Sequence, residues 1–141
     1  MIQLQHAFST GHDVEYNWEA VLDLDRVVPC VEGGRVTERT GDDAAKAEIK
    51  IKMGAMSMTF TGTVTVTERD EDAHRAVLSV KSRERGGSSA NADVTFALDG
   101  EGGTITTEAK ISGKAASMGE GVTTSVLDAL INDFTEKLKK I

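Results

Sequence analysis

The chain has 141 residues, a length that fits one compact domain, so we expect a single domain over residues 1–141. It carries 23 acidic and 16 basic residues, for a net charge of -7, and only 4% of its residues are aromatic. This charge repels a phosphate backbone and the composition offers little surface for base stacking, so nucleic acid is disfavoured as a partner. A single cysteine excludes an internal disulfide, which is typical of a reducing compartment.

The N-terminal segment, MIQLQHAFSTGHDVEYNW, lacks the basic start and the long apolar run of a secretory signal. No segment of the chain approaches the roughly 20 consecutive apolar residues that a membrane-spanning helix needs. We therefore expect a cytoplasmic protein that makes at most peripheral contact with a membrane.

Short helices are expected after a first strand. Between Asp13 and Val28 the chain reads DVEYNWEAVLDLDRVV, in which apolar side chains recur at helical spacing. The residues STGHD just before them are suited to capping a helix N-terminus. The pattern therefore predicts one helix, or a helix followed by a short second one.

Cys30 follows this segment in RVVPCVEGGRV, beside the only proline, Pro29. A catalytic thiolate would need a nearby base and an electropositive setting to lower its pKa. The flanking side chains are apolar, and free cysteine is among the most buried residue types. We therefore expect Cys30 to be a packed, unreactive residue at the hinge between the short helices and the next strand.

The middle of the chain alternates apolar and polar residues with a period of two, which is typical of strands with one buried face. The pattern recurs in AEIKIKM, SMTFTGTVTVTE, AVLSVKS, ANADVTFALDG and TITTEAKISG. The segments between them, RDEDAH, RERGGSS and DGEGG, are short and rich in charge or glycine, as hairpin turns require. We therefore predict a meander of antiparallel strands.

One long amphipathic helix is predicted from about Glu120 to the end of the chain. A sheet with a single dry face needs a cover, and this helix has the length and the apolar stripe to provide it. A sheet that curves around such a helix leaves a cavity between them. The stripe consists of side chains at three- and four-residue steps, namely Val126, Leu127, Leu130, Ile131, Phe134, Leu138 and Ile141.

No pattern in the chain indicates a metal, phosphate or catalytic site. His6, His12 and His74 lack the spacing of a ligand pair, and each is expected to be solvated. RDEDAH lacks the glycine and the spaced oxygens of a calcium loop, and GEGG lies between two strands instead of before a helix. We therefore expect no metal, no cofactor and no catalytic residue.

The methionines leave two interpretations open. Met53, Met56 and Met58 fall together in KMGAMSM, and Met118 precedes the terminal helix. Methionine is flexible and polarisable, so these side chains suit either an ordinary core or the wall of a pocket that takes apolar ligands. The cavity-forming architecture favours the pocket.

Three stretches of the chain carry a resemblance to one known family. In VVPCVEGG, Cys30, Val31 and Gly33 match a Cys-apolar-Pro-Gly step, with Glu32 in place of the proline. ISGKAASMG matches a Gly-Lys-x-Ala-x-x-Gly passage into a final helix. In KIKMGAMSMTFTGTVTVTE the matching residues on two paired strands are Met53, Gly54, Phe60 and Gly62. Over nearly its whole length the chain resembles the family of the carbon monoxide dehydrogenase G subunit, within the helix-grip superfamily of START-like and Bet v 1-like (SRPBCC) proteins.

The resemblance implies an α+β helix-grip fold: a seven-stranded antiparallel sheet wrapped around a long C-terminal helix, with two short helices after the first strand. The family is associated with molybdenum-containing carbon monoxide dehydrogenases, as an accessory protein that links the enzyme to the membrane or its quinone pool. The implied partners are therefore an apolar small-molecule ligand and a dehydrogenase.

These observations lead to three hypotheses about function. In the first, which we favour, a non-enzymatic carrier holds an apolar or amphipathic small molecule, such as a quinone or a lipid, between sheet and helix. In the second, the protein is a cyclase or hydrolase like others of the superfamily, although the predicted buried faces contain almost no titratable group. In the third, it is a protein-only adaptor for a molybdenum dehydrogenase.

A carrier of this kind would line its cavity with side chains from the buried faces of the strands and the terminal helix. Cys30 and Glu32 are expected beside the cavity entrance, where Glu32 influences which molecules enter. The expected lining residues are Met53, Met58, Phe60, Leu78, Phe96, Leu127, Ile131 and Phe134.

Overall fold

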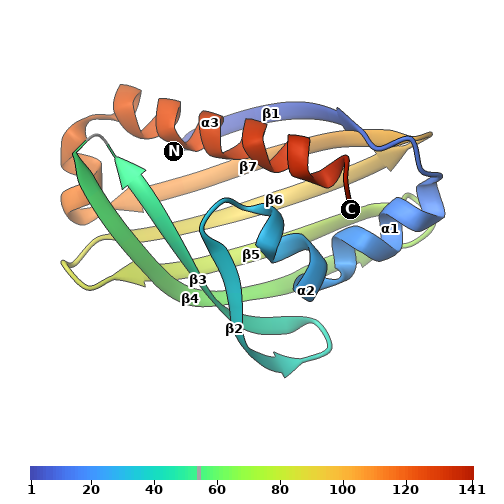
Figure 1. Ribbon diagram of the computed structural model, residues 1–141, viewed down its shortest axis with the longest axis horizontal. Helices are drawn as coiled ribbons and strands as arrows, with labels where there is room; N and C mark the ends of the chain where they lie inside the picture. The colour runs from blue at the N-terminus through green and yellow to red at the C-terminus, as the bar shows by residue number, and fades with distance from the viewer. Residues whose placement is uncertain (54) are drawn as a thin grey trace.

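The computed structural model describes residues 1–53 and 55–141, with the backbone alone for Met53, and Figure 1 shows the arrangement of its strands and helices. The strands are β1 (Ile2–Ser9), β2 (Gly34–Gly41), β3 (Ala44–Met53), β4 (Met56–Asp70), β5 (Arg75–Glu84), β6 (Ser89–Asp99) and β7 (Gly102–Ser112). The α-helices are α1 (Val14–Leu22), α2 (Leu24–Val27) and α3 (Glu120–Leu138), and the 3-10 helices are η1 (Val28–Cys30) and η2 (Gly113–Met118).

The strands form one seven-stranded antiparallel sheet in the order β1-β7-β6-β5-β4-β3-β2. The meander predicted from the alternating segments is confirmed, and the first strand joins it by pairing with the last, from Ile2 opposite Ala109 to Ser9 opposite Gly102. Figure 1 shows the sheet curving around α3, with α1 and α2 on the side where the C-terminal end of α3 lies. The helix-grip fold implied by the resemblance is therefore confirmed.

The predicted alternation of buried and exposed side chains is also confirmed. On β7 the side chains of Ile105, Thr107 and Ala109 are buried, whereas the intervening Thr106 and Glu108 are exposed. Successive side chains of a strand point to opposite faces, so the buried set of each strand faces α3. The inner face of the sheet is therefore mostly apolar, with a few polar side chains such as Thr107.

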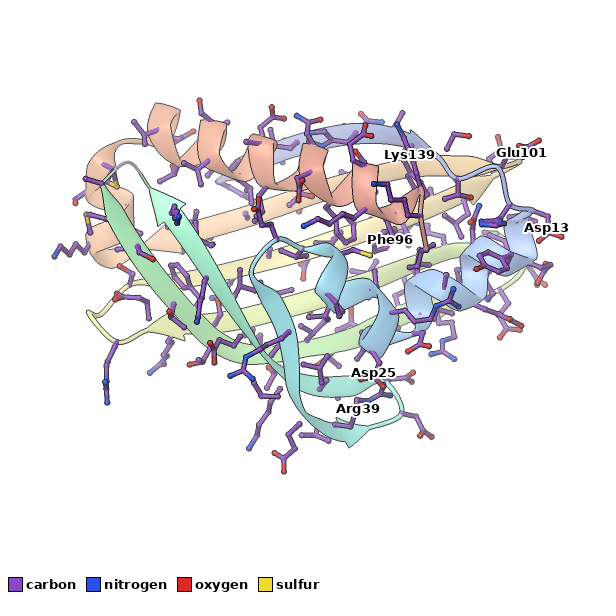
Figure 2. All side chains as sticks on the ribbon, in the orientation of Figure 1. Asp13, Asp25, Arg39, Phe96, Glu101 and Lys139 are labelled. Carbon is purple, nitrogen blue, oxygen red and sulfur yellow. The ribbon has the colours of Figure 1, made fainter. Side chains whose placement is uncertain are left out.

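The short helical segment divides into α1, α2 and η1. The Asp13 carboxylate caps α1 by accepting a hydrogen bond from the Tyr16 amide at 2.8 Å. Asp23 ends α1 and caps α2 by accepting from the Asp25 amide at 3.1 Å. Asp25 also pairs with Arg39 of β2 at 2.9 Å, an ion pair on the outer side of the molecule (Figure 2). The helices are thereby held against the edge of the sheet.

The terminal helix α3 confirms the predicted amphipathic stripe in part. Ile131, Phe134 and Leu138 are buried, and the Phe134 ring lies 6.2 Å from the Phe96 ring on β6. The stripe residues in the first half of the helix are only half-buried. The second half of α3 therefore packs on the sheet through its aromatic and aliphatic side chains, and the first half leaves space below it.

Gly62 on β4 is needed for the close approach of β5. A Cβ atom at this position would lie 1.9 Å from the Lys81 carbonyl oxygen, a backbone atom that can move only if the strands separate. We expect Gly62→Ala to lower the free energy of unfolding by about 1–3 kcal/mol, as overpacking in a core does. Equilibrium urea denaturation measures the change.

The matched control for this substitution is Gly41→Ala. A Cβ atom on Gly41 would meet no described atom within 4 Å. We expect the free energy of unfolding of this variant to lie within about 0.5 kcal/mol of the wild-type value. Equal stability of the two variants would contradict the steric argument for Gly62.

Candidate ligand-binding cavity

A cavity of about 190 Å³ lies between the inner face of the sheet and α3. Its walls come from β3 to β7, from the region of α2 and η1, and from one side of α3. Phe96 of β6, labelled in Figure 2, lies between the sheet and the helix and is 1% exposed. The cavity therefore lies in the half-open space between α3 and the sheet that the helix-grip arrangement creates.

The lining of the cavity is almost wholly aliphatic and aromatic. Among the described residues, no Asp, Glu, Lys, Arg, His or Cys lines it. Two of its four polar residues satisfy their hydroxyl groups locally: Ser82 donates to the Ala90 carbonyl at 2.6 Å, and Thr123 lies 3.2 Å from the Gly119 carbonyl. The other two are Asn91, which is exposed, and Thr107, which is buried. Such a wall binds by exclusion of water and by shape.

Six of the eight residues that we expected to line the cavity do so in the structure. They are Phe60, Leu78, Phe96, Leu127, Ile131 and Phe134. Met58 is buried, in a cluster with Phe60 and Ala115 near η2, but unlike these two residues it does not line the cavity. The eighth residue is Met53, whose side chain is not among the described parts of the chain.

The two residues expected at the entrance do not line the cavity. Cys30 is buried at the end of η1. Its thiol donates a hydrogen bond to the Arg26 carbonyl oxygen, with an Sγ–O distance of 3.4 Å. Burial raises the pKa of this thiol, while Lys137 and Arg26 oppose the shift. Glu32 is exposed in the following turn. The lining in this region comes instead from the neighbouring valines, Val27, Val28 and Val31.

The turn that contains Glu32 has the geometry that proline favours. Gly34 donates its amide to the Val31 carbonyl at 2.8 Å, and Gly33 has a φ of 77°, so Glu32 is the second residue of a type II turn. Val31, at φ -78° and ψ 125°, has the extended backbone required before proline.

We expect Glu32→Pro to raise the free energy of unfolding by about 0.4–1 kcal/mol, because proline restricts the unfolded chain in a turn that already suits it. Chemical denaturation of Glu32→Pro beside Glu32→Ala measures the effect. A loss of stability specific to the proline variant would show that the turn does not have this geometry.

His6 was wrongly expected to be solvated. Its side chain is 9% exposed, and Nε2 donates to Asp128 Oδ1 of α3 at 2.7 Å. It lies on β1 under α3, on the same inward face as the buried Ile2 and Phe8. The alternation in IQLQHAFS already places these three side chains together, so this pattern could have indicated that His6 is buried.

A second hollow, lined mostly by acidic side chains, opens between α1 and the β2–β3 and β4–β5 turns. His74, also expected to be solvated, lies here with a 23% exposed side chain, 2.8 Å from Glu15 and edge-on to Trp18. In the part of the chain that the structure describes, no group of three or more His, Cys, Asp or Glu residues could hold a metal ion. The apolar cavity between the sheet and α3 is the candidate functional site, because it is enclosed by side chains from both.

The model of the family described as the G subunit of carbon monoxide dehydrogenase (CoxG) matches residues 7–141. The chain belongs to the CoxG family. The match covers every element of the CoxG fold described above from the second half of β1 to α3. Among curated proteins no match was found. Within the described residues, no helix is both long enough and apolar enough to cross a membrane.

Solved structures share the fold of this CoxG protein. A conserved protein from Geobacillus kaustophilus has 22% identity and a TM-score of 0.74, covering 98% of this chain and 90% of that one. A START superfamily protein from Mycobacterium smegmatis has 9% identity and a TM-score of 0.59, covering 98% and 94%. The Zhui aromatase/cyclase from Streptomyces sp. R1128 has 13% identity and a TM-score of 0.58, covering 98% and 91%. At these identities the likeness shows a START-like fold and no activity.

Proposed function

We propose that this CoxG-family protein is a non-enzymatic carrier that holds an apolar or amphipathic small molecule, quinone-like or lipid-like, between the sheet and α3. The observation that supports the proposal is the lining of the cavity, in which no described residue is ionisable. A cavity of this composition favours ligands that leave water readily, because burial of apolar surface is the main gain it offers.

The size of the cavity limits what it encloses. Its volume of about 190 Å³ is somewhat larger than that of an engineered apolar cavity of about 150 Å³ that binds benzene. It is smaller than the roughly 300–1,000 Å³ typical of sites for drug-sized ligands. We infer that one or two rings or a short chain are enclosed, and that a longer tail would lie outside or would require α3 to move.

The expected affinity is moderate. A ligand that buries about 300 Å² of apolar surface gains about 7 kcal/mol before the cost of ordering. This corresponds to dissociation constants in the micromolar range or weaker. Such an affinity suits a carrier that must release its ligand.

An enzymatic role is less well supported. A cyclase or hydrolase needs an acid or a base within hydrogen-bond reach of its substrate, and the described lining contains neither. His6 and Asp128, which form a partly buried pair, are not part of this lining. The likeness to an aromatase/cyclase is a likeness of fold.

The direct test is purification of the protein from its native host, followed by denaturation and mass spectrometry of the released small molecules. We expect one or a few apolar compounds at a substantial fraction of one molecule per chain. A variant with a filled cavity, Ala92→Phe, purified in parallel identifies compounds that bind elsewhere. If wild type and variant release the same compounds, or none, the carrier proposal is wrong.

We further propose that the carrier acts in the cytoplasm as an accessory to a carbon monoxide dehydrogenase-type enzyme, as the name of its family suggests. Affinity capture of the protein from native cells under mild conditions should then recover dehydrogenase subunits in fixed proportion. If the captured protein holds a ligand but no dehydrogenase, the proposed association with such an enzyme is wrong and the carrier proposal is retained. Capture of a dehydrogenase without ligand would favour the protein-only adaptor.

A further inference from the structure

The hydroxyl group of Thr107 is the unusual feature of the cavity. Thr107 lies on the inward face of β7, lines the cavity and is 2% exposed. Its Oγ1 atom has no hydrogen-bond partner among the described residues. The buried hydroxyls of Ser82 and Thr123 in the same lining are engaged by backbone carbonyl groups. Thr107 therefore presents a buried, unused donor and acceptor to an otherwise apolar space.

An unpaired buried hydroxyl is unfavourable for folding, since it loses its hydrogen bonds to water without replacement. Valine has nearly the same shape as threonine and would fill the position without this cost. The residues opposite Thr107 on the two neighbouring strands are apolar, namely Leu4 on β1 and Val94 on β6. The natural partner for its hydroxyl is therefore a group that enters the cavity.

The chemistry of the surroundings limits what that group is. A hydroxyl both donates and accepts, so it pairs equally well with a carbonyl oxygen and with another hydroxyl. An ionised carboxylate, phosphate or ammonium group would be strongly disfavoured, because no described lining residue carries a compensating charge. His6 Nδ1 is also unpartnered, but His6 does not line the cavity.

We propose that Thr107 is the polar anchor of the cavity and that the ligand is an uncharged molecule with a hydroxyl or carbonyl oxygen on an apolar body. This inference rests on the proposed carrier function and narrows its ligand class. This ligand class excludes free fatty acids and other anions, and it includes neutral phenols, alcohols, ketones and quinones.

The test compares three probes that share one ring system: naphthalene, 1-naphthol and 1-naphthoate. Their binding to the full chain is measured by isothermal titration calorimetry for the wild type, Thr107→Val and Thr107→Ser. We expect Thr107→Val to weaken 1-naphthol about fivefold, the usual net effect of one hydrogen bond. We expect naphthalene to bind this variant as tightly as the wild type or more tightly. Thr107→Ser retains the hydroxyl and should keep the preference for 1-naphthol.

The outcomes separate the anchor from the carrier function. Suppose that the wild type binds naphthalene and 1-naphthol, and that Thr107→Val changes both affinities equally or neither of them. The proposal that Thr107 is the anchor is then wrong, and the carrier proposal is retained. The same holds if 1-naphthoate binds the wild type as tightly as 1-naphthol. If the wild type binds none of the probes, the carrier proposal fails together with the anchor.

A second measurement needs no ligand. Because an unpaired hydroxyl is removed, Thr107→Val should melt at the same temperature as the wild type or at a higher one. A marked fall in melting temperature would show that the hydroxyl has a partner within the protein, and would overturn the proposal.

Discussion

Replacing Ala92 with phenylalanine is expected to weaken the binding of small apolar ligands strongly while the protein stays folded. Ala92 lies on β6, lines the cavity and stands opposite Val80 on β5 and Ala109 on β7. A phenyl group at this position would extend into the cavity that the ligand needs. We expect the affinity for 1-naphthol to fall at least about tenfold, or 1.4 kcal/mol. Calorimetry of wild type and variant at equal concentration gives the ratio.

The control for this prediction comes from the same strand. Ala97 is exposed on the outer face of β6, so Ala97→Phe adds the same group without entering the cavity. We expect this variant to bind 1-naphthol as the wild type does. Undiminished binding by a folded Ala92→Phe protein would mean that the ligand occupies another place, and the cavity would lose its assignment as the functional site.

Truncating Phe96 to alanine is expected to cause the largest loss of stability. The Phe96 ring is 1% exposed, faces the Phe134 ring of α3 at 6.2 Å and forms part of the cavity wall. Removal of a buried phenyl group costs about 3–5 kcal/mol, part of which is the new void. Here that void would join an existing cavity, so we expect little relaxation of the surrounding side chains. Small domains are stable by only about 5–15 kcal/mol, so this loss would remove a large share of the total stability.

Equilibrium urea denaturation of Phe96→Ala and Leu127→Ala tests this prediction. Leu127 also lines the cavity but is half-buried on α3, so its truncation should cost only about 1 kcal/mol. Similar losses for both variants would contradict the view that Phe96 and Phe134 join the helix to the sheet. A folded Phe96→Ala protein should also bind larger probes than the wild type does.

Much of the candidate site was predictable because strand and helix periodicity depend on neighbouring residues alone. The alternation on β6 placed Phe96 on the buried face, and the helical stripe placed Ile131 and Phe134 on the side of α3 that faces the sheet. Met58 satisfies the same alternation and is buried, but it does not line the cavity. Periodicity identifies the buried face of an element, and it does not show which part of that face borders a cavity.

Taken by itself, the sequence determined the antiparallel meander, the capped helix at Asp13, the amphipathic terminal helix and the apolar character of the space between them. Tertiary structure alone decided where that space lies and which polar groups it contains. The pairing of β1 with β7 brings His6 beneath α3, and the curvature of the sheet leaves the Thr107 hydroxyl inside the cavity without a described partner. The physical reason is that hydrogen-bond satisfaction depends on contacts between residues far apart in the chain, which no local pattern records.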